Sequence, residues 1–336
     1  MQTLSDLTTL RLGGPAGRLV EAPDAESVVE EVRKADAVGE PVLLLGGGSN
    51  LVVADAGFPG TVVRVASTGI VTERRPDGSV LLTVEAGEDW DTVVAATVAE
   101  GLGGLECLSG IPGRTGATPV QNVGAYGVEV AALLESVDLY DRASGSTATV
   151  PAADLGLGYR TSVLKGSAAA VVLRVRFVLP GGGASMPIAY AELARVLGVD
   201  PGSTVPAAVA REAVLELRRG KGMVLAAEDH DTWSAGSFFT NPIVDAAPDP
   251  EMPRWPAGGR VKLPAAWLIQ HAGFAPGHQG PGGRVALSSR HVLALTNRGG
   301  GRTEDLLELA REVQAGVRAR FGIDLHPEPV LVGCAL

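Results

Sequence analysis

The chain has 336 residues, a length that at about 100–200 residues per domain predicts two or three domains. Hydrophobic residues make up 46% and charged residues 20%, which excludes a disordered or collagen-like chain. The formal net charge is −10 and no block of like charges occurs. This charge pattern argues against nucleic acid or an anionic membrane as the partner.

Cysteine and histidine usage argues against disulfide and metal chemistry. Cys107 and Cys334 lie in no CxxC pair, and the five histidines show no HxH or HExxH spacing. We therefore expect no metal. The N-terminus carries no basic region followed by an apolar stretch, and no run of about 18 apolar residues occurs. We expect a cytoplasmic protein without a membrane segment.

The first third of the chain alternates strand and helix patterns. Asp24 is expected to cap a helix with Val28, Val29, Val32 and Ala35 on one face. A second helix is expected from Asp89 to Glu100, ended by Gly101. Strands are predicted at Arg18–Ala22, Pro41–Leu45, Thr61–Ala66 and Leu81–Ala86.

The remaining elements indicate an α/β or α+β class. Strands are predicted at Val137–Asp141 and Val171–Leu179, and a helix from Pro206 to about Arg219. Residues 245–259 are rich in proline and glycine and predict a loop. Trp267 is interpreted as a core residue of a short helix, and Thr303–Phe321 as an amphipathic helix followed by Gly322.

Two glycine-rich segments are candidates for ligand binding. The sequence GGGSN, residues 46–50, follows a buried strand, so its backbone N–H groups can converge on an anion; an ordinary strand-to-loop turn explains it equally well. It matches neither GxGxxG opening a helix nor the Walker motif. The segment 105–127 contains five glycines and two prolines, and a loop of this length and composition is usually functional.

Several polar residues are weaker candidates when taken singly. Ser237 lies between a glycine and two phenylalanines, which suits a proton donor, although a turn or N-cap serine is the simpler interpretation. Glu328 is held between Pro327 and Pro329, as a rigidly presented carboxylate or as a surface glutamate. Arg160 and the Arg218–Lys221 cluster could bind an anion or be solvated.

The order of these segments resembles the UDP-N-acetylenolpyruvoylglucosamine reductase family of flavoenzymes. The matching segments are GGGSN, LSGIPGRTGATPVQNVGAYG, GYRTSVLK, SAGSFFTNP, PAAWLIQHAGF and HPEPVLVG, over nearly the whole length. The segment around Tyr190 is similar to the family's longer form, whose loop closes over substrate. The acidic stretch between Lys221 and Ser237, with Glu228, Asp229 and Asp231, is longer than the family pattern and puts the role of Lys221 in question.

The resemblance implies an α+β architecture of α/β lobes. It is the FAD-binding fold of the vanillyl-alcohol-oxidase/p-cresol-methylhydroxylase (PCMH) type with a third α/β substrate domain. The implied domains are residues 1–68 with 326–336 as the first FAD-binding lobe, 69–222 as the second lobe, and 223–325 as the substrate-binding domain. The final strand, around Val330–Gly333, would return to the first lobe.

The resemblance also implies the chemistry. NADPH would reduce a non-covalently bound FAD, and the flavin would pass hydride to UDP-N-acetylglucosamine enolpyruvate, giving UDP-N-acetylmuramate for peptidoglycan. Arg160 and Glu328 would stabilise the enolate, and Ser237 would supply the proton. The implied FAD-binding residues are Gly46, Gly47, Gly48, Ser49, Asn50, Gly110, Ile111, Pro112, Gly113, Gly116, Gln121, Asn122 and Gly127.

The implied substrate contacts are made by polar side chains with aromatic support. They are Tyr126, Tyr159, Tyr190, Arg218, Lys221 and Asn241. The expected partners are the enolpyruvyl UDP-sugar and NADPH, and the expected state is a monomer. Two alternatives stay open from the sequence: an alcohol or hydroxy-acid oxidase of the same fold, and a flavin-free UDP-sugar binding protein.

Overall fold

The computed structural model describes residues 3–336, so the first two residues of the predicted lobe 1–68 lie outside it. The chain forms two compact units. The sheet unit comprises Gly17–Gly47 and Pro59–Gly220, and the C-terminal unit comprises Met1–Ala16, Gly48–Phe58 and Lys221–Leu336. Each unit is therefore built from separate stretches of the chain. The three-domain division expected from the sequence stays a prediction.

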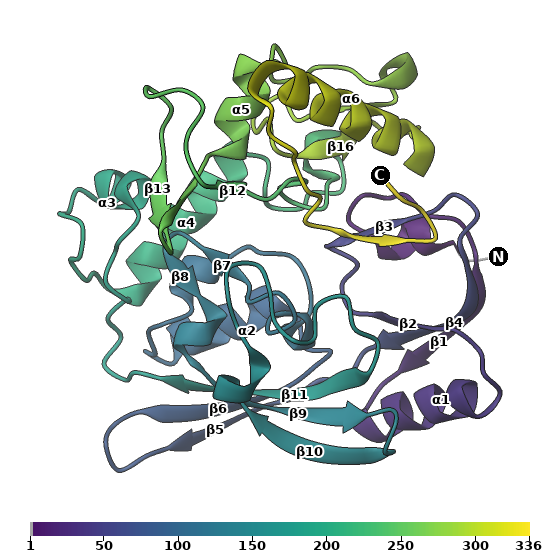
Figure 1. Cartoon of the computed structure of the whole chain (residues 1–336). Helices are drawn as coiled ribbons and strands as arrows, with labels where there is room; N and C mark the ends of the chain where they lie inside the picture. The colour runs from purple at the N-terminus through teal and green to yellow at the C-terminus, as the bar shows by residue number, and fades with distance from the viewer. Residues whose placement is uncertain (1–2) are drawn as a thin grey trace. The chain divides into compact units, whose positions relative to one another are not determined.

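The predicted mixture of helices and strands is confirmed (Figure 1). The α-helices are α1 (Ala25–Ala37), α2 (Trp90–Ala99), α3 (Ala191–Leu197), α4 (Ala207–Gly220), α5 (Ala265–His271) and α6 (Thr303–Phe321). The strands are β1 (Ala16–Ala22), β2 (Val42–Leu45), β3 (Leu51–Val53), β4 (Phe58–Val65), β5 (Ile70–Arg74), β6 (Val80–Glu85), β7 (Gly124–Ala125), β8 (Val128–Glu129), β9 (Leu134–Asp141), β10 (Ser146–Pro151), β11 (Ala170–Leu179), β12 (Ile243–Val244), β13 (Trp255–Ala257), β14 (Arg260–Lys262), β15 (Val285–Leu287), β16 (Leu295–Asn297) and β17 (Val330–Val332).

The helix starts follow the predicted caps. The Asp24 carboxylate accepts a hydrogen bond from Ser27 N at 2.7 Å, and the Asp89 carboxylate accepts one from Thr92 N at 3.0 Å. Each bond satisfies an amide that the first helical turn leaves without an internal partner. Gly322 ends α6 with φ of 68°, as predicted from its position.

The sheet unit contains two larger sheets besides the two-stranded β7-β8 sheet. One has the order β1-β4-β2, with β2 and β4 parallel, and the other is an antiparallel sheet with the order β10-β9-β11-β6-β5. Val93 and Val94 of α2 pack in one core with the five-stranded sheet. Val28 and Val32 of α1 pack in a second core that includes β4 and β11.

The C-terminal unit has a core formed by distant parts of the chain. Leu10, Val52 and Phe238 belong to one buried cluster with residues of α5 and α6. The last strand, β17, pairs in parallel with β3. The parallel pairing ties the end of the chain to a segment that directly follows the GGGSN motif.

Several elements were not predicted from the sequence, and two of the differences have a clear reason. The predicted loop 245–259 contains β13, which pairs with β14 and ends in a turn at Gly258 and Gly259. Strand β10 was not predicted because its residues are mostly exposed and show no apolar alternation. It is an edge strand, held by backbone pairing with β9 instead of by burial of its side chains.

Candidate active site

In the C-terminal unit, residues 234–240 form an irregular segment with a neighbouring segment on each side. Phe238 N donates a hydrogen bond to Leu293 O at 2.8 Å, and Glu328 N donates one to Phe238 O at 2.8 Å. Ser237 therefore lies next to the segment that carries Glu328. The structure brings these two predicted catalytic residues together.

Local sequence explains why this segment is rigid. Phe238 and Phe239 are both 1% exposed, and their rings meet edge to face with centroids 5.1 Å apart. Pro327 and Pro329 restrict the backbone on either side of Glu328 to extended conformations. The half-buried Ser237 hydroxyl thus stands on a backbone anchored by two buried rings.

A histidine that the sequence analysis did not single out lies beside Ser237. The distance from Ser237 Oγ to His291 Nε2 is 3.5 Å. No motif links these positions, which are 54 residues apart. Backbone pairing between Phe238 and Leu293 places His291 there, and sequence spacing carries no signal of it.

The turn before His291 is organised around a buried carboxylate, Asp231. Its oxygens accept hydrogen bonds from Ser288 Oγ at 2.9 Å and from Ser289 N at 3.0 Å, and form ion pairs with Arg290 and Arg298. Burial by itself raises the pKa of Asp231, but these hydrogen bonds outweigh burial and lower the pKa to about 2. Asp231 therefore stays ionised and holds the turn.

The acidic stretch noted between Lys221 and Ser237 has a structural role. Asp229 caps the short 3₁₀ turn His230–Thr232 and pairs with Arg290 at 2.5 Å. Together with Asp231 it fastens the 288–291 turn to the segment that leads into Ser237. The extra acidic residues are thus part of the scaffold near the candidate site.

Three further predicted residues lie in the C-terminal unit. Asn241 Oδ1 accepts a hydrogen bond from Ala265 N at 2.9 Å, at the start of α5. Asn50 O accepts one from Val330 N at 2.9 Å. Lys221 is half-buried just after α4. The hydrogen bond to Ala265 gives the Asn241 oxygen a scaffold role that the sequence did not indicate.

In the sheet unit, the start of GGGSN packs against the second glycine-rich loop. A Cβ added at Gly47 would lie 2.7 Å from the Gly113 Cα, so only glycine permits this approach of two backbones. Among the described residues, none accepts a hydrogen bond from the half-buried amides of Gly46, Gly47, Ile111 or Gly113. Such clustered amide donors are the groups that bind phosphate oxygens.

The second glycine-rich loop is anchored from within the sheet unit. Trp90 Nε1 donates a hydrogen bond to Leu108 O at 3.1 Å, and the Asp91 carboxylate accepts one from Gly110 N at 2.6 Å. Gly116 lies against Ala86, where a Cβ would be 2.6 Å from the Ala86 Cβ. The loop is held by specific contacts although it contains no long regular element.

Arg160 adopts φ of 54°, which is uncommon outside glycine. Its Nη2 donates a hydrogen bond to Gly124 O at 2.8 Å, and its guanidinium lies 5.6 Å from the centre of the Tyr159 ring. The Asn122 side chain forms hydrogen bonds with Glu129, Gly158 and Ala131. Asn122 therefore holds the loop in shape through its side chain, and Gln121 and Gly127 lie on the same loop.

Tyr126, Tyr190 and Arg218 form a cluster in the sheet unit. The two tyrosine rings meet edge to face at 5.5 Å, and Tyr190 is 42% exposed. Burial raises the pKa of Tyr126 to about 12, with Arg218 opposing the shift. Burial also lowers the pKa of Arg218, while Arg219 is exposed. Of the two neighbouring arginines, Arg218 is the one placed inside the fold.

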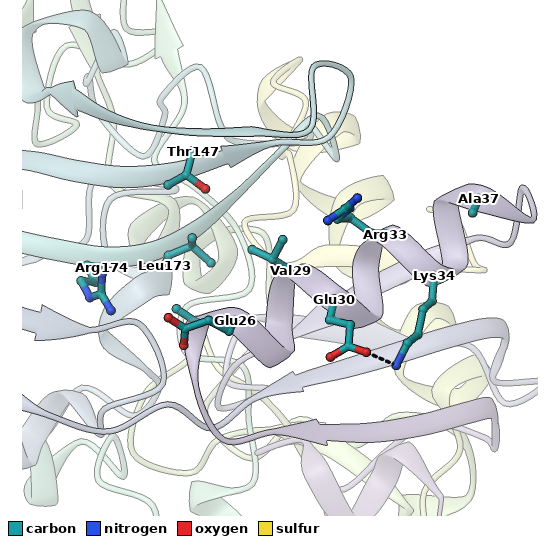
Figure 2. Close-up of a pocket in the computed structure, with 10 residues that line it drawn as sticks. Glu26, Val29, Glu30, Arg33, Lys34, Ala37, Thr147, Leu173 and Arg174 are labelled. Atoms are coloured by element: carbon teal, nitrogen blue, oxygen red, sulfur yellow. Dashed lines mark ion pairs between the residues drawn. The ribbon is translucent and has the colours of Figure 1, made fainter.

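An open groove of about 670 Å³ lies elsewhere in the sheet unit, between α1, β10 and β11. Figure 2 shows Val29 and Leu173 facing this groove, with Glu30 and Lys34 paired at its edge. None of its lining residues is a predicted site residue. The groove is therefore separate from the residues that the sequence selected.

Residues 3–336 contain neither of two other kinds of feature. No cluster of three or more His, Cys, Asp or Glu side chains is arranged to hold a metal ion in this part of the chain. None of the described helices combines the length and the apolar character needed to cross a membrane.

Comparison with known proteins gives a consistent result. Residues 16–151 match the family model of an FAD binding domain, and residues 228–332 match that of the UDP-N-acetylenolpyruvoylglucosamine reductase C-terminal domain. Proteins named UDP-N-acetylenolpyruvoylglucosamine reductase from Saccharopolyspora erythraea and Salinispora arenicola are 65% and 56% identical, each over 99% of this chain and 95% of the relative.

A solved structure is similar over almost the whole chain. It is the UDP-N-acetylenolpyruvylglucosamine reductase from Thermus caldophilus, with a TM-score of 0.69 and 27% identity. The match covers 98% of this chain and 97% of that one. With the FAD-binding model, it confirms the predicted fold class.

Proposed function

Because this chain belongs to the UDP-N-acetylenolpyruvoylglucosamine reductase family, we propose that it reduces UDP-N-acetylglucosamine enolpyruvate to UDP-N-acetylmuramate. The reaction uses NADPH and FAD and belongs to peptidoglycan precursor synthesis. The observation that carries the chemistry is the placement of Ser237 and Glu328 on adjacent, hydrogen-bonded backbone segments. This arrangement presents a hydroxyl and a carboxyl from one rigid part of the fold.

The residues of the glycine-rich segments fit FAD. The amides of Gly46, Gly47, Ile111 and Gly113 are half-buried donors without protein acceptors among the described residues, as a pyrophosphate requires. Gly48 and Ser49 continue the same segment. Bound FAD supplies hydride transfer between NADPH and the sugar. We propose that it is bound without a covalent link, since no histidine lies in these loops.

The proton side of the reaction is assigned to Ser237. Addition of hydride to the enol ether builds negative charge on the neighbouring carbon and its carboxylate. The Ser237 hydroxyl donates a proton to that carbon, and buried Phe238 and Phe239 keep its backbone in place. Arg160 and Glu328 are proposed to stabilise the enolate, since a preorganised charge partner lowers the barrier of such a step.

Substrate binding is proposed for the cluster of Tyr126, Tyr190 and Arg218. A buried guanidinium beside two tyrosines offers positive charge and hydroxyl donors, which suits a diphosphate or a sugar carboxylate. Tyr159, whose ring centre lies 5.6 Å from the Arg160 guanidinium, is proposed to contact the same ligand. Lys221 and Asn241 are proposed as further contacts.

We also propose that the enzyme acts as a monomer in the cytoplasm. Its substrate and NADPH are both expected in that compartment, and its net charge of −10 argues against a nucleic-acid partner. Size-exclusion chromatography with light scattering tests the oligomeric state, and a dimeric mass at micromolar concentration would contradict it.

The Ser237→Ala variant tests the proposed function. Reduction of the bound flavin by NADPH should proceed at nearly the wild-type rate, because the hydroxyl takes no part in it. Reoxidation by the enolpyruvyl sugar should slow by about 10²- to 10⁴-fold, the usual contribution of a general acid. Anaerobic stopped-flow absorbance separates the two half-reactions. An equal loss in both would show that Ser237 is not the proton donor.

A further inference from the structure

We propose that His291 passes a proton to Ser237 Oγ while Ser237 protonates the substrate carbon, so that no free serine alkoxide forms. This inference rests on the proposed function and adds a residue to it. A serine hydroxyl is a weak acid because its conjugate base is an unstable alkoxide. A second donor on the same oxygen removes that difficulty.

The geometry places one nitrogen of the imidazole at the serine oxygen. Ser237 Oγ and His291 Nε2 are 3.5 Å apart, at the outer edge of hydrogen-bonding distance. Hydrogen bonds of catalytic groups are often long without substrate and shorten in the complex. Both side chains are half-buried, so the pair is shielded but can exchange protons with water.

Backbone hydrogen bonds next to both residues fix the positions of Ser237 and His291. Phe238, which follows Ser237, donates its amide to Leu293 O at 2.8 Å. The His291 amide donates to Ser288 Oγ at 3.1 Å, and Ser288 Oγ donates to the Asp231 carboxylate at 2.9 Å. Asp231 is a positioning residue in this scheme, since it acts on His291 through the turn.

The arginines of the turn are committed to the scaffold. Arg290 pairs with Asp229 and Asp231, and Arg298 pairs with Asp231. Their guanidinium groups therefore form ion pairs with the carboxylates that hold the turn in place. His291 is the titratable side chain of this turn that lies at the Ser237 oxygen.

The proposed step balances without any added reactant. The Oγ–H bond of Ser237 breaks and a C–H bond forms on the substrate carbon. At the same time the Nε2–H bond of the imidazolium breaks and a new Oγ–H bond forms. Ser237 ends the step as a hydroxyl, His291 ends it as a neutral imidazole, and the imidazole then takes one proton from water.

The experiment compares the His291→Gln variant with wild-type enzyme in the two half-reactions. Flavin reduction by NADPH should be unchanged, and reoxidation by the enolpyruvyl sugar should slow by about 10²-fold, the lower end of general acid contributions. In mixtures of H₂O and D₂O, a plot of the wild-type reoxidation rate against the D₂O fraction should be curved, because two protons move in the same step. The variant should give a straight line.

Two further variants guard against a purely structural effect. In His291→Ala, added imidazole should restore part of the reoxidation rate. Free imidazole can replace the missing side chain but does not repair a distorted fold. His278→Gln serves as the matched control, because His278 pairs with Glu312 in the same unit and should give wild-type rates.

The outcomes separate the two proposals. An unchanged reoxidation rate in His291→Gln, a straight line for wild-type enzyme in D₂O mixtures, or no rescue by imidazole overturns the relay and leaves Ser237 as the donor. Wild-type enzyme whose reduced flavin is not reoxidised by the UDP-sugar overturns the proposed function, and the relay with it.

Discussion

At the scale of single residues, the proton-donor role proposed for Ser237 depends on its neighbours. A serine beside two phenylalanines has no special reactivity, and the sequence left a turn serine as the simpler interpretation. The structure adds Glu328 on one flanking segment and His291 on the other. A functional role for Ser237 is therefore supported by these two neighbours, which sequence proximity does not reveal.

Asp231 allows a prediction about acid stability. Its pKa falls from 3.8 to about 2 on folding, so the folded state binds its proton less tightly than the unfolded state. The resulting stabilisation, roughly 2 kcal/mol, is fully present above about pH 4 and is lost as the pH falls toward 2. Asp231→Asn should lower the free energy of unfolding at pH 7, because Arg290 and Arg298 each lose an ion pair with the Asp231 carboxylate.

Urea unfolding of wild-type protein and Asp231→Asn between pH 7 and pH 3 measures this effect. The difference in free energy of unfolding between wild-type protein and Asp231→Asn should be constant from pH 7 to about pH 5 and already smaller at pH 3. A gap that widens on acidification would contradict the assigned pKa direction.

At the scale of elements, the two glycine-rich loops act through their backbones. Gly47 and Gly113 meet where a side chain would clash, and Gly48 adopts φ of 61° with a Cβ position 2.0 Å from Leu7 O. These restraints explain the glycine run in GGGSN. They leave amide groups pointing to no protein acceptor among the described residues, as the anion interpretation of the sequence requires.

Substituting Gly47 by alanine should weaken FAD binding. The added Cβ forces the Gly46–Gly47 backbone away from Gly113 and misplaces one or two amide donors, worth roughly 1.5–3 kcal/mol with a charged acceptor. The dissociation constant for FAD should rise about 10- to 100-fold. Titration of the flavin-free protein with FAD, followed by flavin fluorescence, measures it.

Gly300→Ala is the matched control, since a Cβ there meets nothing within 4 Å and its φ is ordinary. It should bind FAD as wild-type protein does. Equal affinities for Gly47→Ala and Gly300→Ala would show that the Gly47 amide region takes no part in binding FAD.

At the scale of the whole molecule, the C-terminal unit depends on the last strand. β17 pairs with β3, Ala54 N donates to Val332 O at 2.9 Å, and Val332 is 8% exposed. A chain ending at Pro329 loses this pairing and the burial of Val332. Its free energy of unfolding should fall by at least about 2 kcal/mol. Urea unfolding measures the loss, and an unchanged midpoint would show that β17 contributes nothing to the unit.

Most of the helices and longer strands could be predicted from local sequence. Asp24 and Asp89 cap helices where expected, and Val171–Leu179 lies within a strand. β10 was missed because an exposed edge strand carries no apolar alternation. The glycine-rich loops and the catalytic residues were indicated by their motifs and by the family resemblance, and their roles remain proposals.

The sequence alone determined the helix caps and the glycine-rich loops, because each depends on residues within a short stretch. It also indicated the family, through the order of several motifs along the chain. Only the tertiary structure decided that Ser237 lies beside both Glu328 and His291, that Asp231 holds the turn before His291, and that Arg218 is buried while Arg219 is exposed. The physical reason is that pairing between distant segments is selected by burial of the shared core around Phe238 and α6, a property of the whole unit.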